Sequence, residues 1–158
     1  MVWGCIVKGR KGLLVVLEYP GGQGGGMTAA RYQHQVLDEV LHTFYQAILE
    51  EKGQVVFQQD GAPSHTAKST IAWLDINKVD RMPHPPFSPD VNPIEPLWHV
   101  VKDNIRARTR IPTTLDELKT AVKEAWDQIT VEDIDKLVGS MQDRVQALLK
   151  AKGGHTQY

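Results

Sequence analysis

Two acidic residues, Asp60 and Glu95, occupy positions from which carboxylates can hold a metal ion. Asp60 ends the largely apolar run 55–60, and Glu95 lies in the segment 92–95, with 34 residues (61–94) between the two acids. A carboxylate where a strand gives way to a loop, and another in the first turn of a helix, supply the hard oxygen ligands that Mg²⁺ prefers. The pair therefore indicates phosphodiester chemistry.

Each of these acids also has an ordinary structural interpretation. Asp60 precedes Gly61, and Asp-Gly pairs commonly begin a turn. Glu95 lies three residues after Asn92, which is the spacing of a capping box at a helix N-terminus. Spacing alone leaves these roles open beside metal binding.

Hydrophobic periodicity predicts the elements that must position the two acids. Residues 1–7 and 13–17 predict an antiparallel hairpin joined by 8–12, and apolar residues at intervals of three and four predict a helix from Thr28 to near Gly53. The elements expected next are a strand over 55–59, a helix capped by Ser64, a short strand around 79–82, and a helix capped by Asn92 that runs through Ile105.

The C-terminal third predicts a helical tail from about residue 113. Two capping boxes, Thr114 with Glu117 and Thr130 with Asp133, each begin a helix, and the second helix is expected to extend through Leu148. The glycine-rich segment 21–26 predicts a flexible connector, because it lacks the Lys-Ser/Thr that follows a phosphate-binding loop. Strands and helices that alternate in this order indicate an α/β fold.

Composition limits the class of protein. A chain of 158 residues fits one domain, and its single cysteine, Cys5, excludes an internal disulfide and any multi-cysteine zinc site. The N-terminus does not resemble a signal peptide, and no apolar stretch approaches the roughly 20 residues needed to cross a bilayer. We therefore expect an intracellular protein without a membrane partner.

A local basic cluster stands against a nearly neutral background. The net charge is -1, whereas a dedicated DNA-binding domain would be more basic. Four basic residues nevertheless fall within 102–110: Lys102, Arg106, Arg108 and Arg110. Cations near a helix C-terminus are favoured by the helix dipole, so a solvated helix end and a contact with the DNA backbone both remain open.

The two segments around the acids carry a specific family resemblance. Residues 58–65, Gln-Gln-Asp-Gly-Ala-Pro-Ser-His, and 88–98, Ser-Pro-Asp-Val-Asn-Pro-Ile-Glu-Pro-Leu-Trp, closely resemble the catalytic core of mariner-superfamily DDE transposases. Residues 2–4 and 153–158 resemble further motifs of that family, so the resemblance covers 1–158. It implies a ribonuclease H-like fold, with a mixed sheet flanked by helices, and a triad of acids that holds two Mg²⁺ or Mn²⁺ ions.

Carried over by this resemblance, Asp60 matches the second acid of the triad and Glu95 the third. The first acid has no match, because no aspartate precedes Asp38. We therefore expect the first strand of the family fold and its N-terminal helix-turn-helix domains to be missing from this sequence. Weak or single-ion metal binding is expected, and the isolated chain is predicted to be inactive.

Three further residues are assigned supporting roles beside the acids. His65 follows the Asp60 turn and is expected to support it, and Asn92 is expected to cap the helix that carries Glu95. Asp90 lies in a Ser-Pro-Asp turn, and we expect its side chain to bond the neighbouring amides rather than to replace the unmatched acid.

The family resemblance implies metal-dependent DNA strand cleavage and strand transfer in DNA transposition. The partners it implies are transposon-end and target DNA and further copies of the chain, and the location it implies is nuclear in a eukaryote and otherwise intracellular. The alternative is a non-catalytic DNA-binding or protein-interaction module derived from a transposase.

Overall fold

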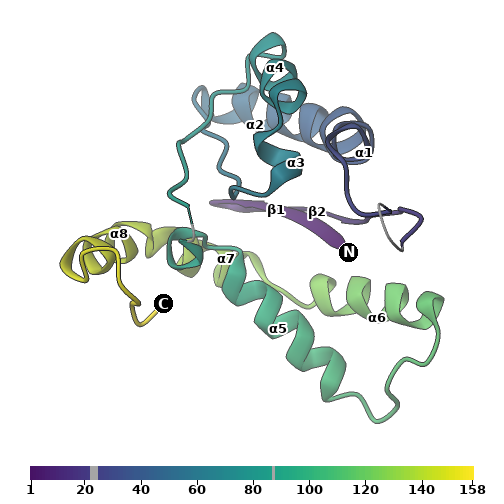
Figure 1. The fold of residues 1–158 in the computed structure, drawn as a ribbon. Helices are drawn as coiled ribbons and strands as arrows, with labels where there is room; N and C mark the ends of the chain where they lie inside the picture. The colour runs from purple at the N-terminus through teal and green to yellow at the C-terminus, as the bar shows by residue number, and fades with distance from the viewer. Residues whose placement is uncertain (22–24, 87) are drawn as a thin grey trace. The chain divides into compact units, whose positions relative to one another are not determined.

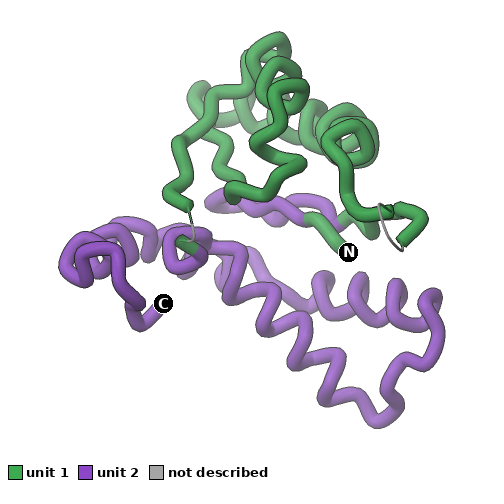
Figure 2. Tube along the Cα trace, in the orientation of Figure 1, with its two compact units in different colours: residues 1–3, 15–88 green, residues 4–14, 89–158 purple. Residues whose placement is uncertain are grey.

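The chain divides into two compact units. The computed structural model describes residues 1–21, 25–86 and 88–158. Unit 1 comprises Met1–Trp3 and Val15–Ser88, and unit 2 comprises Gly4–Leu14 and Pro89–Tyr158 (Figure 2). The connector predicted over 21–26 lies partly outside the described residues, and a single domain over 1–158 stays a prediction.

A β-hairpin opens the chain (Figure 1). Strand β1 (Val2–Val7) pairs with β2 (Arg10–Val16), and the two form the one sheet found among the described residues. The turn needs only two residues, and Gly9 takes a φ of 82°, which glycine adopts at little cost. The predicted hairpin is confirmed, but its second strand begins at Arg10 rather than at residue 13.

Unit 1 contains one long helical run. It consists of α1 (Ala29–Tyr32), the π-helix η1 (Gln33–Leu41) and α2 (His42–Lys52). The run begins and ends as predicted: the Thr28 side chain accepts a hydrogen bond from the Arg31 amide, and Gly53 closes the helix with a left-handed φ of 75°. The spacing of the apolar residues did not indicate the π-helical geometry in the middle.

The apolar face of this run builds the core of unit 1. The buried residues of this core are Leu17, Tyr32, Val36, Leu37, Leu41, Tyr45, Leu74 and Val79. Because Val36, Leu37 and Leu41 lie on one face of the helix, the predicted amphipathic pattern is confirmed.

The two strands predicted over 55–59 and 79–82 were wrong. Among the described residues these segments share one isolated parallel bridge, between Phe57 and Arg81. The Phe57 amide donates to Asp80 O at 2.7 Å, and Phe57 O accepts from the Met82 amide at 2.9 Å.

The Tyr45 side chain supplies a physical reason for the short pairing. Its hydroxyl donates to Val55 O at 2.9 Å and accepts from the Asp80 amide at 3.0 Å. A side chain of α2 thus satisfies backbone groups that a longer ladder would have paired with each other.

The helix predicted to be capped by Ser64 is two helices, and Ser64 is not a cap. Helix α3 (Pro63–Thr66) starts two residues earlier than a Ser64 cap would place it, because proline suits the first helical position, where no donor is needed. Ala67 then leaves helical geometry with a ψ of 141°, and α4 (Lys68–Ile76) follows. Ser64 is buried, and its carbonyl accepts from the Thr70 hydroxyl at 2.7 Å.

Unit 2 contains the hairpin segment Gly4–Leu14, and the rest of it is mostly helical. Its elements are the 3-10 turn η2 (Pro89–Val91) and the helices α5 (Glu95–Arg106), α6 (Leu115–Asp127), α7 (Val131–Gly139) and α8 (Met141–Lys150). Both predicted capping boxes are present, at the start of α6 and of α7. The core contains the buried residues Val91, Leu97, Val101, Ala121, Val122, Ala125, Trp126, Ile129 and Ile134.

The second helix of the predicted tail is interrupted at Ser140. This residue ends α7 with a ψ of 0° and precedes α8. Its hydroxyl donates to Leu137 O at 2.7 Å and accepts from Arg144 Nε at 2.9 Å. The tail therefore contains three helices rather than two, because a serine side chain offers the backbone an alternative partner here.

Strand β2 is attached to the end of α6 within unit 2. The Lys11 ammonium donates to the carbonyls of Trp126, Asp127 and Ile129 at 3.0, 3.0 and 2.9 Å, and so satisfies the C-terminal end of α6. Gly4 leaves no room for a side chain, because an added Cβ would lie 2.9 Å from the Trp98 ring. No helix of the described residues is long and apolar enough to cross a membrane.

Candidate active site

The Asp60 carboxylate is held by two neighbours in unit 1. Its Oδ1 lies 2.6 Å from His65 Nδ1 and accepts from the Ala62 amide at 3.0 Å. Both contacts use Oδ1, so among the described residues Oδ2 has no hydrogen bond, and half of the side chain is exposed. The carboxylate is therefore oriented while one oxygen remains available to a ligand.

A second layer of contacts holds His65. Its ring lies against the Tyr32 ring, with centroids 4.4 Å apart. The Tyr32 hydroxyl donates to Gln59 Oε1 at 2.9 Å, and Gln59 Nε2 donates to His65 O at 3.3 Å. Tyr32 and Gln59 thereby connect α1 to the Asp60 turn. Sequence reasoning missed both residues, because nothing in the spacing links Tyr32 to a turn far along the chain.

Glu95 has a looser environment in unit 2. It is the first residue of α5 and is partly buried. Its Oε1 accepts from Asn92 Nδ2 at 3.4 Å, and its amide donates to Asn92 O at 3.2 Å. Oε2 has no hydrogen bond among the described residues. The side chain thus has one long polar contact, in contrast to the short pair at Asp60.

Asn92 is not the N-cap that the sequence predicted. Residues 93–94 form a turn before α5, so the helix begins later than expected, with Ile94 as its cap residue. Asn92 Oδ1 instead accepts from the Ile94 amide at 3.4 Å, a local turn contact. Pro96 lies in the first turn of α5, where its missing donor costs nothing.

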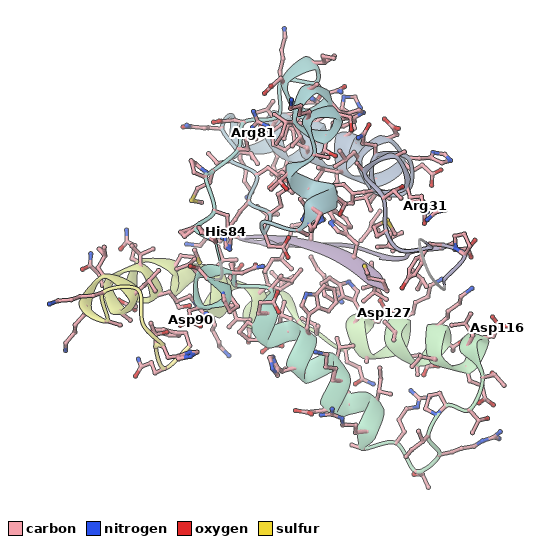
Figure 3. All side chains as sticks on the ribbon, viewed as in Figure 1. Arg31, Arg81, His84, Asp90, Asp116 and Asp127 are labelled. Atoms are coloured by element: carbon pink, nitrogen blue, oxygen red, sulfur yellow. The ribbon has the colours of Figure 1, made fainter. Side chains whose placement is uncertain are left out.

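Asp90 does not bond neighbouring amides, contrary to the prediction. Its Oδ2 accepts from the amide and the hydroxyl of Thr156, at 3.0 and 2.7 Å. Figure 3 labels Asp90 on η2, an element that packs against α8. The hydrogen bonds from Thr156 lower the pKa of Asp90, and the charges of His155 and Arg144 lower it further.

The four basic residues of the cluster lie at the end of α5 and in the loop after it. Three of them form exposed ion pairs: Arg106 with Asp103 at 3.3 Å, Arg108 with Glu124 at 2.7 Å, and Arg110 with Glu117 at 3.0 Å. Lys102 is exposed and has no ion pair among the described residues. Exposed ion pairs contribute little to the free energy of unfolding. These arginines can therefore leave their carboxylate partners and bind a phosphate with little loss of stability.

The residues fit a divalent metal in type but not in number. Asp60 and Glu95 each keep a carboxylate oxygen without a hydrogen bond, and such oxygens are what Mg²⁺ and Mn²⁺ take as ligands. Within the described residues, however, no group of three or more His, Cys, Asp or Glu side chains could hold a metal ion. Asp60 belongs to unit 1 and Glu95 to unit 2.

Comparison with known proteins identifies the family. Residues 13–119, which include both acids, match the family described as DDE superfamily endonuclease. The match covers more than half of the chain, and the chain therefore belongs to this family. The resemblance to mariner-superfamily DDE transposases is confirmed.

Relatives from Caenorhabditis elegans match the whole chain. The transposable element Tc1 transposase is 32% identical and the Tc3 transposase 28%. The chain covers 54% of the Tc1 protein and 45% of the Tc3 protein, so it spans about half the length of the curated relatives it matches.

Solved structures confirm the ribonuclease H-like fold. The catalytic domain of Mos1 mariner transposase matches with a TM-score of 0.71 at 22% identity, over 85% of this chain and 66% of that chain. The Mos1 mariner paired end complex with Mn matches with a TM-score of 0.70 at 24% identity, over 84% of this chain and 39% of that chain.

Proposed function

We propose that this transposase catalytic domain supplies Asp60 and Glu95 to a site for metal-dependent DNA strand cleavage and strand transfer. The observation that carries the proposal is the inclusion of both acids in the region that matches the DDE endonuclease family. Mos1 catalytic-domain structures with Mg and with Mn support a divalent ion as the cofactor. Asp60 and Glu95 would be the residues that hold such an ion, which would supply activation of the attacking oxygen and stabilisation of the leaving one.

The protein's own residues have distinct roles in this proposal. His65 holds the Asp60 carboxylate by one oxygen and leaves the other free, so that Asp60 needs little rearrangement to bind a ligand. Asn92 makes the corresponding, longer contact with Glu95. Asp60 thus lies on a turn that orients it, and Glu95 lies at the first position of α5.

The isolated chain is proposed to be inactive, because the sequence contains no aspartate before Asp38 that could match the first acid of the triad. The test is nicking of supercoiled plasmid by the 158-residue chain in the presence of Mn²⁺. We expect no cleavage above a metal-free control. If the chain cleaves the plasmid, and Asp60→Ala and Glu95→Gln each abolish that cleavage, the proposed inactivity is wrong. The same result would support the two acids as the site.

DNA, and further copies of the chain, are the proposed partners. The Mos1 paired end and strand transfer complexes support this for the family. Sedimentation of the purified chain tests self-association. A nuclear location, should the chain come from a eukaryote, follows from DNA as partner and can be tested with a fluorescent fusion.

The exposed basic cluster favours a second candidate, a non-catalytic DNA-binding module. Lys102 and the three weakly paired arginines present cations that can contact phosphates. The test is DNA affinity as a function of salt, without divalent metal. Lys102→Ala should reduce the salt slope by about one for a phosphate contact, whereas an unchanged slope would contradict this role.

A further inference from the structure

The C-terminal residues of the chain fold back onto the turn that precedes Glu95. Thr156 donates from its amide and its hydroxyl to Asp90 Oδ2, at 3.0 and 2.7 Å. The Tyr158 amide donates in turn to Thr156 Oγ1 at 3.2 Å. A segment at the end of the chain is therefore fixed to η2 by two hydrogen bonds, and a third holds the segment itself in shape.

Arg144 of α8 holds the same turn by its backbone. Its side chain is 3% exposed, and Nη1 donates to Asp90 O at 2.9 Å. Ser140 Oγ accepts from Arg144 Nε at 2.9 Å, and the guanidinium carbon lies 4.6 Å from the centre of the Tyr158 ring. A buried guanidinium is costly unless it is satisfied, and here hydrogen bonds and a cation–π contact satisfy it.

A short chain of hydrogen bonds leads from this turn to the acid. The Asn92 amide donates to Pro89 O at 2.8 Å, and the Glu95 amide donates to Asn92 O at 3.2 Å. Asn92 Nδ2 then contacts the Glu95 carboxylate at 3.4 Å. Because Glu95 has few side-chain contacts of its own, the position of its carboxylate depends on this backbone.

We propose that Arg144, Thr156 and Tyr158 form a C-terminal clasp that positions Glu95 by fixing both the side chain and the backbone of Asp90. The three are positioning residues, and their importance for catalysis rests on the proposed role of Glu95. The clasp lies entirely within unit 2.

The clasp is tested by amide hydrogen exchange of the 158-residue chain, without metal or DNA. Thr156→Val removes the hydroxyl at nearly constant size, and Thr156→Ser retains it. In Thr156→Val we expect the amides of Asn92 and Glu95 to exchange about tenfold to a hundredfold faster, as expected for the loss of one hydrogen bond to a charged group. Thr156→Ser should restore the original rate, and α6 should keep its protection in both variants.

Two results would overturn the clasp. One is unchanged exchange at Asn92 and Glu95 in Thr156→Val. The other is an equal acceleration of exchange throughout α6, because that would show a loss of global stability rather than a local change at the clasp. Removal of Thr156–Tyr158 gives a second variant and should accelerate exchange at the same two amides at least as much. Because exchange needs no cleavage, failure of the clasp leaves the proposed nuclease site untouched, and the plasmid assay can fail without affecting the clasp.

Discussion

The two acids are held in opposite ways. Asp60 is oriented through its own carboxylate, by His65 at 2.6 Å and the Ala62 amide at 3.0 Å. Glu95 has one carboxylate contact, at 3.4 Å, and depends on the backbone of the turn before it. One carboxylate is fixed by close neighbours and the other depends on a distant segment, so the two should respond differently to mutation.

The largest effect is expected for Arg144→Ala. The change leaves Asp90 O and the Tyr158 ring without the buried guanidinium, so we expect unit 2 to lose about 2–3 kcal/mol of unfolding free energy. Denaturant unfolding followed by the fluorescence of the tryptophans measures this. Arg106→Ala is the matched control, because its ion pair is exposed and should change stability by less than about 0.5 kcal/mol. Equal effects of the two changes would contradict the buried role of Arg144.

A smaller effect is expected on the Asp60 side from Tyr32→Phe. The ring that packs on His65 remains and the hydroxyl bond to Gln59 is lost, so we expect a destabilisation of about 1 kcal/mol. Thermal or denaturant unfolding measures it, and hydrogen exchange should localise the change to the Gln59–Ala62 turn. If exchange accelerated at Glu95 instead, the two acids would not be supported independently.

The smallest effect is the pH dependence supplied by Asp90. Its pKa is lowered from 3.8, chiefly by the Thr156 hydroxyl, so the folded state binds its proton less readily than the unfolded state does. The resulting stability is present above 3.8 and is lost as pH falls through the lower folded value. His155 and Arg144 are the charged groups that face it.

The measurement compares unfolding midpoints of the unmodified chain and Thr156→Val across this acid range. The two midpoints should differ above 3.8 and converge below the folded pKa, because protonation of Asp90 removes the same interaction. A difference that stays constant through the acid range would show that Thr156 acts without the Asp90 charge.

The hydrogen-bond partners explain why prediction succeeded at some places and not at others. The capping boxes at Thr114 and Thr130 were predictable because each joins residues three positions apart. The hydrogen bond between Asp90 and Thr156 joins residues 66 positions apart, and no local sequence pattern predicts it. Expecting Asp90 to bond nearby amides was therefore reasonable from sequence and wrong in the structure.

By itself, the sequence determined the family, the hairpin, the capping boxes at Thr114 and Thr130 and the two candidate acids, because each depends on a motif or on contacts between near neighbours. Tertiary structure decided the rest. The Tyr45 hydroxyl binds the backbone of Val55 and Asp80 where a strand pairing was expected. The Tyr32 hydroxyl binds Gln59, next to the Asp60 turn. The C-terminus closed on Asp90. Each of these contacts joins segments that are far apart in the sequence. Bringing such segments together costs loop-closure entropy, and the packing of the core offsets that cost, whereas contacts between near neighbours do not.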